Sequence, residues 1–420
     1  MFNTPVRFYT WKKVRGSNQS RPYTPYRCQA GAGHTHLMGE IPSPVCDGLI
    51  HNLRGVSAMH VTDLSEEQDE CHPNHITKAI IDSTVDRGLR EIEEDPKRSL
   101  RKLTDMARLF NKGRFLDEVL GMVQDLLRND DSPYYTTIEN TMRHVTRQNI
   151  KGFGINFGYC GLTFGGKRIR EIEPTVNFRI PWSLNIRIDT RSRDSMTVDE
   201  VENCIIQGQP LGIYVYIIRI SGSCSCLQRL CEVMSRYEDC AFMILVPDCL
   251  LSAADLKAIK KCTNTMFLFP SDTQSALKNT EVMRSQKSLY GIYAFYGNDD
   301  AAEWCSGRKT ASLLRYSPAF ALLVSDDTAN QRCCRRVARY CRSERIHPEY
   351  PIVLFDAIGD SMMVYRTVSE NRDGIYLEIL ENGDIKTATE IFTDFRHTVS
   401  LKQIFEMAIP KTDSPKTSSS

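Results

Sequence analysis

Apolar runs alternate with amphipathic segments through the second half of the chain. Phe242–Val246 and Ala319–Val324 are apolar at every position, which is typical of parallel strands covered on both faces. The segments between such runs have apolar residues at helical spacing. The pattern predicts strands near residues 183–189, 213–220, 241–246, 264–269, 289–295, 319–325 and 351–355. It predicts helices at 197–208, 225–237, 252–261, 273–285, 300–315 and 328–343.

Strands and helices that alternate in this way build α/β folds around a parallel sheet. We therefore expect an α/β fold with a partial (β/α)6 TIM-like barrel over residues 181–356. Apolar residues at helical spacing predict an N-terminal helical region over residues 76–150. Near the C-terminus, Gly374–Leu380 and Ile385–Ala388 flank an Asn-Gly turn, which predicts a small hairpin followed by a short helix at 400–408.

Between these regions lies a connector, residues 151–180, with the most glycine-rich stretch of the chain. Its Gly161-x3-Gly165-Gly166-Lys167 superficially resembles a phosphate loop. Arg168 stands where a phosphate loop has Ser or Thr, and no apolar strand precedes it, so phosphate binding is the less favoured interpretation. We expect residues 151–180 to form a flexible connector that closes over the barrel mouth.

The two ends of the chain lack any persistent period. Residues 1–75 are rich in proline, glycine and polar residues and predict a poorly ordered extension, and residues 410–420 predict a disordered tail. Six of the nine histidines lie in the extension, and Cys71-His72-x-x-His75 is the tightest group. The spacings are irregular for zinc, which favours a histidine-rich tail over a metal site.

Composition narrows the classes of function. Lys plus Arg total 53 and Asp plus Glu total 52, so the overall charge does not favour nucleic acid or an anionic membrane as partner. No apolar run approaches the ~20 residues of a membrane helix. Met1–Trp11 lacks the apolar core of a secretory signal, so we expect a cytoplasmic protein. Fifteen cysteines in such a protein are expected to be reduced and mostly buried thiols.

The most specific sequence lies in the first unit of the barrel. Pro181-Trp182 precedes the first strand, Thr197–Val201 opens the next helix, and Gln207–Ile218 leads into the second strand. In this order the chain resembles bacterial radical SAM proteins that have an N-terminal helical region, a radical SAM core and a SPASM-like C-terminal region. The resemblance covers residues 76–409 and implies that residues 357–409 are a degenerate SPASM-like region.

Each functional motif of that family is altered here. The CxxxCxxC loop, whose three thiolates hold a 4Fe–4S cluster in the family, is replaced by Thr190–Met196, which contains no cysteine. The GGEP turn, which holds the amino group of S-adenosylmethionine, corresponds to Ser221, Gly222 and Ser223. The cysteine that would follow Asp384 in an auxiliary cluster site is missing as well. The resemblance thus implies no cofactor, unless the site has been rebuilt.

Two groups of cysteines are candidates for a rebuilt site. Cys224, Cys226 and Cys231 follow the second strand, at the end of a barrel where active sites form. The second group lies on a predicted helix and consists of Cys333, Cys334 and Cys341, among Arg332, Arg335, Arg336 and Arg339. Buried thiols explain both groups more simply than a metal, and a solvated helix face explains the arginines.

Three hypotheses of function follow. The leading one is a pseudoenzyme, a binding or accessory subunit that works with a peptide substrate or an active radical SAM paralogue in peptide or natural-product modification. The first alternative is a radical enzyme that uses 4Fe–4S and S-adenosylmethionine at a non-standard metal site formed by Cys224, Cys226 and Cys231. The second alternative is a metal-binding interaction protein that acts through residues 1–75.

Overall fold

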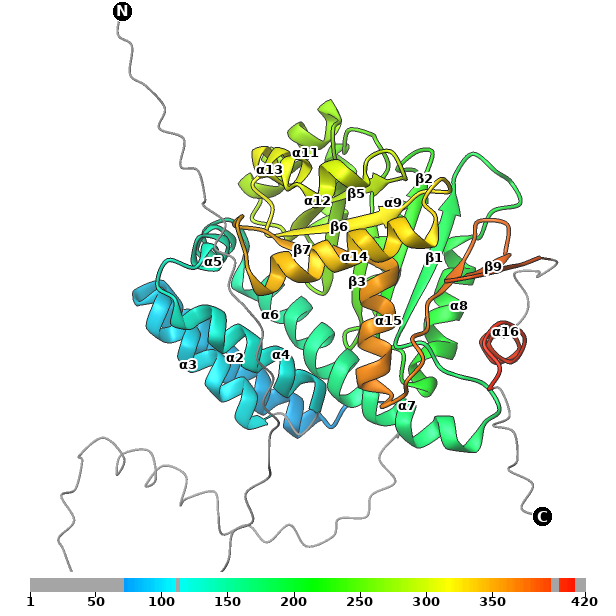
Figure 1. The fold of residues 1–420 in the computed structure, drawn as a ribbon, viewed down its shortest axis with the longest axis horizontal. Helices are drawn as coiled ribbons and strands as arrows, with labels where there is room; N and C mark the ends of the chain where they lie inside the picture. Colours follow the sequence, from blue (N-terminus) through cyan, green and yellow to red (C-terminus); the bar gives the residue numbers. More distant parts are fainter. Residues whose placement is uncertain (1–71, 111–113, 394–399, 412–420) are drawn as a thin grey trace, which may run out of the picture. The chain divides into compact units, whose positions relative to one another are not determined.

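A ten-stranded sheet runs through this computed structural model, which describes residues 72–110, 114–393 and 400–411 (Figure 1). The strand order is β10-β9-β8-β1-β2-β3-β4-β5-β6-β7, and β8 and β1 to β7 are parallel. The strands are β1 (Ser183–Asp189), β2 (Val215–Ser221), β3 (Ala241–Leu245), β4 (Thr265–Pro270), β5 (Tyr290–Tyr296), β6 (Phe320–Ser325), β7 (Val353–Asp356), β8 (Leu377–Ile379), β9 (Ile385–Thr387) and β10 (Ile391–Phe392).

Helices connect the successive parallel strands, as the alternating pattern predicts. They are α8 (Val198–Gly208), α9 (Leu227–Met234), α10 (Ala253–Ile259), α11 (Gln274–Ser285), α12 (Ala301–Cys305), α13 (Arg308–Leu313), α14 (Gln331–Ile346) and α15 (Ala357–Val368). α8 begins with a capping box, in which the Thr197 hydroxyl accepts from the backbone of Glu200 and the Glu200 carboxylate accepts from the backbone of Thr197. The helix predicted over 300–315 is divided at Gly307, which adopts a left-handed conformation.

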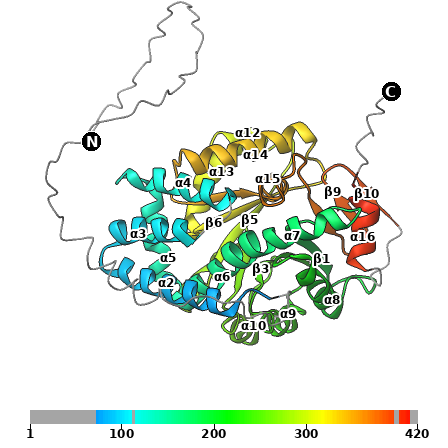
Figure 2. The ribbon, with the colours of Figure 1, turned by 90° about the horizontal axis from the view of Figure 1, so that it is seen from below.

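Contacts between side chains of distant strands show that the sheet is strongly curled, with one concave face. β2 and β5 are three strands apart, about 14 Å in a flat sheet, yet Arg219 Cζ lies 5.5 Å from the centroid of the Phe295 ring. The end of the half-barrel at which β1 to β7 finish is its mouth. An ion pair between Lys386 on β9 and Asp327 after β6, at 4.0 Å, spans this mouth. In Figure 2, α8 to α10 lie on one side of the strands and α12 to α14 on the other. The predicted α/β partial barrel is confirmed.

The predicted C-terminal hairpin is also confirmed and extends the sheet. β9 pairs antiparallel with β8, and the turn between them places Gly383 in a left-handed conformation. β8 in turn pairs parallel with β1, with Asn185 opposite Glu378. Helix α16 (Leu401–Ala408) follows, as expected. This arrangement adds side chains of β8 and β9 to the concave face beside β1.

The glycine-rich connector is helical, so the expectation of a flexible connector over the mouth was wrong. α6 (Arg147–Ile155), a π-helix (Asn156–Gly165) and α7 (Gly166–Ile172) follow one another without a break. They cross the N-terminal ends of the strands, opposite the mouth (Figure 2). A methyl group added to Gly161 would lie 2.6 Å from Val215 Cγ2, so glycine permits the close approach to β2. Since residues 156–165, which precede Lys167, are themselves helical, this segment forms no phosphate loop.

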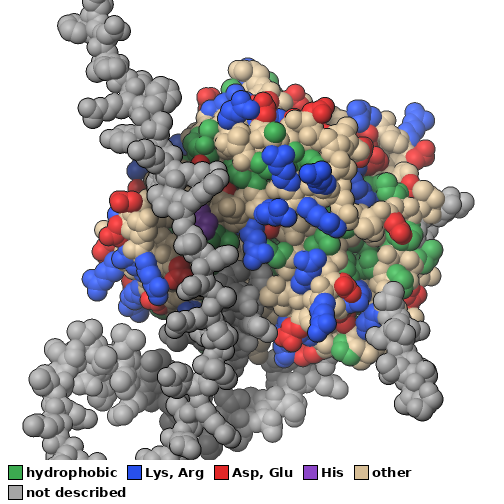
Figure 3. Space-filling view, viewed as in Figure 1, with side chains coloured by type: hydrophobic (Ala, Val, Ile, Leu, Met, Phe, Trp, Pro, Cys, Tyr) green, Lys and Arg blue, Asp and Glu red, His purple; other side chains and the backbone are tan. Residues whose placement is uncertain are grey.

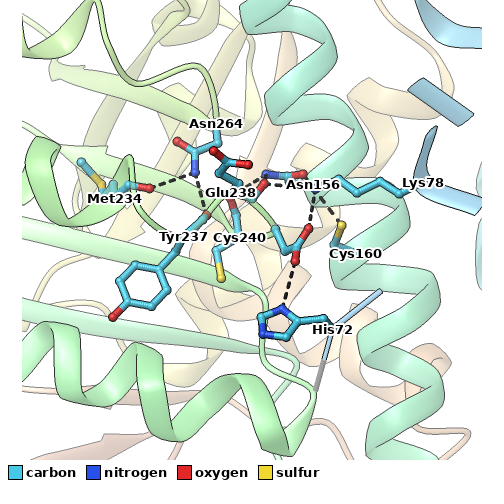
Figure 4. A network of polar contacts seen from close by, with 10 residues as sticks. His72, Lys78, Asn156, Cys160, Met234, Tyr237, Glu238, Cys240 and Asn264 are labelled. Carbon is cyan, nitrogen blue, oxygen red and sulfur yellow. Dashed lines mark hydrogen bonds and ion pairs between the residues drawn. The ribbon is translucent and has the colours of Figure 1, made fainter. Parts of the chain in front are cut away.

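The predicted N-terminal helices are present as α2 (His75–Glu94), α3 (Pro96–Phe110), α4 (Arg114–Arg128) and α5 (Pro133–His144). A polar network fastens α2 and the π-helix to the turn before β3 (Figure 4). Asn156 Nδ2 donates to the carbonyl oxygens of Glu238, at 2.6 Å, and Cys240, at 2.9 Å. Asp239 forms an ion pair with Lys78 and a hydrogen bond with His72. The network thus fixes these helices at the end of the sheet that lies away from the mouth.

The predicted extension over residues 1–75 and the tail over 410–420 lie almost wholly outside the described residues. None of the helices in the described part of the chain combines the length and apolar character that a membrane span requires.

Candidate functional site

Two arginines lie side by side on the concave face of the sheet. β1 and β2 each contain the triplet Ile-Arg-Ile, and the pairing of the strands sets Arg187 directly beside Arg219. Side chains alternate along a strand, so the flanking isoleucines point to the covering helices, where they are almost fully buried. The isoleucines thus pack beneath the helices, and the arginines lie on the opposite, concave face of the sheet.

Arg187 is neutralised by a carboxylate from β8. Its Nε and Nη2 donate to Glu378 Oε1 at 2.5 Å and Oε2 at 2.8 Å, and the Tyr376 hydroxyl donates to Oε2 at 3.1 Å. Burial alone would lower the pKa of Arg187, but the hydrogen bonds to Glu378 raise it overall. A bidentate pair of this kind holds both side chains in one orientation.

Within the part of the chain that the structure describes, Arg219 has no carboxylate partner of this kind. Its Nε is buried without a hydrogen-bond acceptor, and its guanidinium lies over the ring of Phe295. Burial lowers the pKa of Arg219, and the positive charge of Arg187 lowers it further. Arg219 is therefore a desolvated cation whose charge is only partly balanced by the protein.

Hydrogen bonds join the first two loops of the mouth. Thr190 Oγ1 accepts from the backbone N–H of Ser223 at 2.8 Å and donates to the carbonyl oxygen of Ser221 at 3.1 Å. Gly222 adopts a left-handed conformation, and a methyl group there would lie 2.6 Å from Thr190 Oγ1. The residues at the predicted S-adenosylmethionine position, 221–223, thus pack against the turn that follows β1.

That turn is itself compact. Asp189 accepts two hydrogen bonds from the guanidinium of Arg191, at 2.9 and 2.7 Å, and these bonds lower the pKa of Asp189 to about 2. The backbone N–H of Asp189 donates to Ser195 Oγ at 2.7 Å. Residues 190–196 therefore fold as a tight turn fixed by their own side chains.

A disulfide joins the second and third loops of the mouth. Cys224 after β2 is bonded to Cys249 after β3, so the expectation of uniformly reduced thiols was wrong for this pair. The bond fixes the loop that bears Ser223 to its neighbour. The loops that follow β1, β2 and β3, here called the rim, are thereby linked to one another.

The structure does not bring Cys224, Cys226 and Cys231 together as metal ligands. Cys226 lies at the start of α9, where burial raises the pKa of its thiol to about 11. Cys231 is buried within α9, and the Cys262 thiol donates to its carbonyl oxygen at 3.4 Å. Across the described residues, no three His, Cys, Asp or Glu side chains are grouped so that they could hold a metal ion. These residues do not fit a 4Fe–4S cluster, which needs at least three thiolates.

The second cysteine group lies on α14. The Cys333 thiol is buried and donates to the carbonyl oxygen of Gly297 at 3.3 Å, and Cys341 is fully buried. The opposite face of the helix is basic, and Figure 3 shows basic side chains gathered over this part of the surface. Its exposed arginines are Arg332, Arg335, Arg336, Arg339 and Arg342. The thiols pack against the sheet, and the arginines face solvent.

A cleft of about 300 Å³ lies elsewhere, between the end of α7 and the residues that follow α15. Its cations already have partners: Arg170 Nη1 donates to the carbonyl oxygen of Val368, and Lys411 Nζ donates to those of Glu173 and Val176. The concave face is therefore the better candidate, since it holds Arg219, whose Nε has no hydrogen-bond acceptor among the described residues.

Comparison with known proteins finds a distant structural similarity. No family model and no curated protein matches the sequence. The chain is similar to the crystal structure of SuiB from Streptococcus suis bound to S-adenosylmethionine, with a TM-score of 0.41, 11% identity, and coverage of 59% of this chain and 67% of that chain. For SuiB bound to the precursor peptide SuiA the values are 0.42, 12%, 59% and 68%. The similarity concerns the fold alone. The assignment of the partial barrel rests on the strand order and curvature described above.

The arginine pair was missed in the sequence, although a trace of it is visible there. A charged residue in the middle of an apolar strand is unusual, and Ile-Arg-Ile occurs in both of the first two predicted strands. No pattern in the sequence indicates that Glu378 is the partner of Arg187, because the contact depends on the pairing of β8 with β1.

Proposed function

We propose that this protein is a non-catalytic binding subunit that holds a ligand on the concave face of its half-barrel. The observation that supports this most directly is the linked rim, in which Thr190 binds the loop of Ser223 and a disulfide joins Cys224 to Cys249. A rim that is fixed before binding loses little conformational entropy when a ligand arrives. Preformed concave sites with a few fixed polar groups are typical of ligand binding.

The chemistry of the mouth favours binding over radical catalysis. Reductive cleavage of S-adenosylmethionine requires an iron with an open coordination position in a cluster held by thiolates. The turn of residues 190–196 contains no cysteine that could supply a thiolate, and the backbone of residues 221–223 is hydrogen-bonded to Thr190. We infer a protein that accepts a peptide or small metabolite, with an active radical SAM paralogue as the partner that would supply catalysis.

Anaerobic purification followed by iron–sulfide reconstitution tests this proposal. We expect negligible iron per chain and no absorbance band near ~400 nm. The matched control is the triple variant Cys224→Ser, Cys226→Ser and Cys231→Ser, treated identically. About four irons per chain in the wild type, lost in the triple variant, would overturn the proposal in favour of a rebuilt cluster site.

A second control tests whether the N-terminal segment binds the iron. Iron that persists in the triple variant but disappears when residues 1–71 are removed would support metal binding by the His/Cys-rich extension. The shortened chain keeps every residue of the half-barrel, so its far-ultraviolet circular dichroism reports whether the fold is retained.

A further inference from the structure

Of the two adjacent arginines on the concave face, Arg187 has a carboxylate partner, whereas Arg219 has none among the described residues. Arg187 and Arg219 lie in register on adjacent strands, which are about 4.8 Å apart. Like charges placed opposite one another destabilise a sheet. Glu378 binds Arg187 through two hydrogen bonds, whereas Arg219 makes no hydrogen bond or ion pair within the described part of the chain.

The other acidic groups of the mouth do not supply the missing charge. Asp189 is engaged by Arg191, and Asp327 lies 4.0 Å from Lys386. Glu381 attracts Arg219 more weakly than Glu378 does. Among the described residues, Arg219 is therefore a cation of this face without a hydrogen-bonded carboxylate.

Phe295 gives this cation an apolar wall. Phe295 is 44% exposed, although it lies on the inner face of β5. Tyr293 packs edge-on against it with ring centroids 5.6 Å apart, and the Tyr293 hydroxyl is held by the carbonyl oxygen of Val246 at 3.1 Å. An exposed aromatic ring, held from behind, thus adjoins a guanidinium that has no acceptor at Nε.

We propose that Arg219 binds the oxyanion of a ligand, a carboxylate or phosphate group, while an apolar part of the same ligand lies against Phe295. A planar guanidinium receives two oxygens of such a group through parallel hydrogen bonds. The negative charge would also offset the repulsion between Arg187 and Arg219. This inference rests on the proposed function, because the oxyanion belongs to the ligand that the concave face is proposed to hold.

Small aromatic probes test the inference on the full-length protein. Benzoate, phenyl phosphate and the uncharged benzamide are titrated at constant ionic strength, and binding is followed by calorimetry and by the Nε–H resonances of ¹⁵N-labelled arginine. We expect at least one of the two anions to bind, and benzamide to bind at least about tenfold more weakly, because charge-assisted hydrogen bonds are lost. A peptide ending in phenylalanine, compared with its amidated form, distinguishes a peptide carboxylate from a free small acid.

The variants assign the binding to one side chain. Arg219→Gln should lower the affinity for the anion at least about tenfold, and Arg332→Gln, on the exposed face of α14, should leave it unchanged. Arg219→Lys keeps the charge but loses the planar fork, so it should bind more weakly than wild type, which also covers the case in which Arg219→Gln does not fold.

Equal affinity in wild type and both Arg219 variants would overturn the inference, as would equal binding of benzoate, phenyl phosphate and benzamide. Failure of the oxyanion proposal is distinct from failure of the proposed function. If the protein takes up no iron and binds none of these probes, the oxyanion proposal is wrong, but the proposal of a non-catalytic binding subunit still stands.

Discussion

Substitution of Glu378 by Gln isolates the contribution of the one carboxylate that, within the described residues, hydrogen-bonds to the arginine pair. The change keeps the shape of the side chain and one acceptor oxygen, but it removes the negative charge. Arg187 and Arg219 then remain in register with no hydrogen-bonded carboxylate among the described residues. We expect the folded state to lose stability and the loss to depend on Arg219.

The expected magnitude follows from burial and spacing. The side chains of Arg187 and Glu378 are 13% and 8% exposed, so the pair is largely shielded from water. Removal of one partner from a buried pair costs about 3–5 kcal/mol, and the retained acceptor places Glu378→Gln near the lower end. Two like charges about 5 Å apart repel by about 3 kcal/mol at an effective dielectric constant of ~20. Water on the open side of the concave face reduces this repulsion, so we expect about 1–2 kcal/mol to be recovered when Arg219 is removed as well.

The assay is urea unfolding of wild type, Glu378→Gln, Arg219→Gln and the double variant, followed by circular dichroism. The expected order of unfolding free energies places the double variant above Glu378→Gln, and Arg219→Gln at or above wild type. The double-mutant cycle gives the interaction energy directly. A double variant that is no more stable than Glu378→Gln would refute the idea that the two arginines repel each other.

Three further predictions concern other parts of the fold. Burial raises the pKa of Asp356 from 3.8 to about 7, so the carboxyl favours folding when protonated; this contribution, up to about 4 kcal/mol, is fully present below pH ~4 and is lost as the pH rises through 7. Asp356→Asn should therefore flatten the dependence of unfolding free energy on pH between 4 and 8, and an unchanged slope would contradict the assignment. Gly165→Ala would push a methyl group into the carbonyl oxygen of Gly212 and should cost about 2–3 kcal/mol, measured by thermal unfolding. Gly158→Ala, where nothing lies within 4 Å, should instead stabilise the helix by about 0.5–1 kcal/mol; equal effects would mean that the helix does not pack as described. The Cys224–Cys249 disulfide closes a loop of 25 residues, and its reduction should cost about 3.5 kcal/mol in the chain-entropy model. A reductant should lower the unfolding free energy of wild type but not that of the double variant Cys224→Ser and Cys249→Ser, and identical responses would argue against the bond.

The strands and helices of the barrel could be predicted because their periodicity is local. The prediction for β1 over 183–189 matches the observed bounds, and α8 and α11 begin within one residue of their predicted starts. α15, over Ala357–Val368, was missed because the resemblance assigned these residues to a degenerate C-terminal region. The glycine-rich helix was missed because glycine disfavours helices in isolation. Its stability comes instead from close packing on the strand ends, which no local pattern records.

The candidate site was harder to predict, because its residues meet only in three dimensions. Residues 221–223 stay a predicted site, and their contact with Thr190 could not be predicted because it depends on the turn conformation at Gly222. The disulfide joins cysteines from two different loops, and the pairing of Cys224 with Cys249 requires β2 and β3 to be neighbours. The proposed cofactor, partner and oxyanion assignments remain predictions.

The docking of β8 beside β1 also has a consequence for the order in which the protein is assembled during synthesis. Arg187 and Glu378 are separated by 191 positions, so β1 leaves the ribosome long before its neighbour does. Until then β1 presents an unpaired strand edge, which is prone to pair with other chains. Contacts this distant in sequence also form late and slow folding. The concave face therefore reaches its final charge only after the hairpin of β8 and β9 has been made, so an incomplete chain lacks the carboxylate that pairs with Arg187.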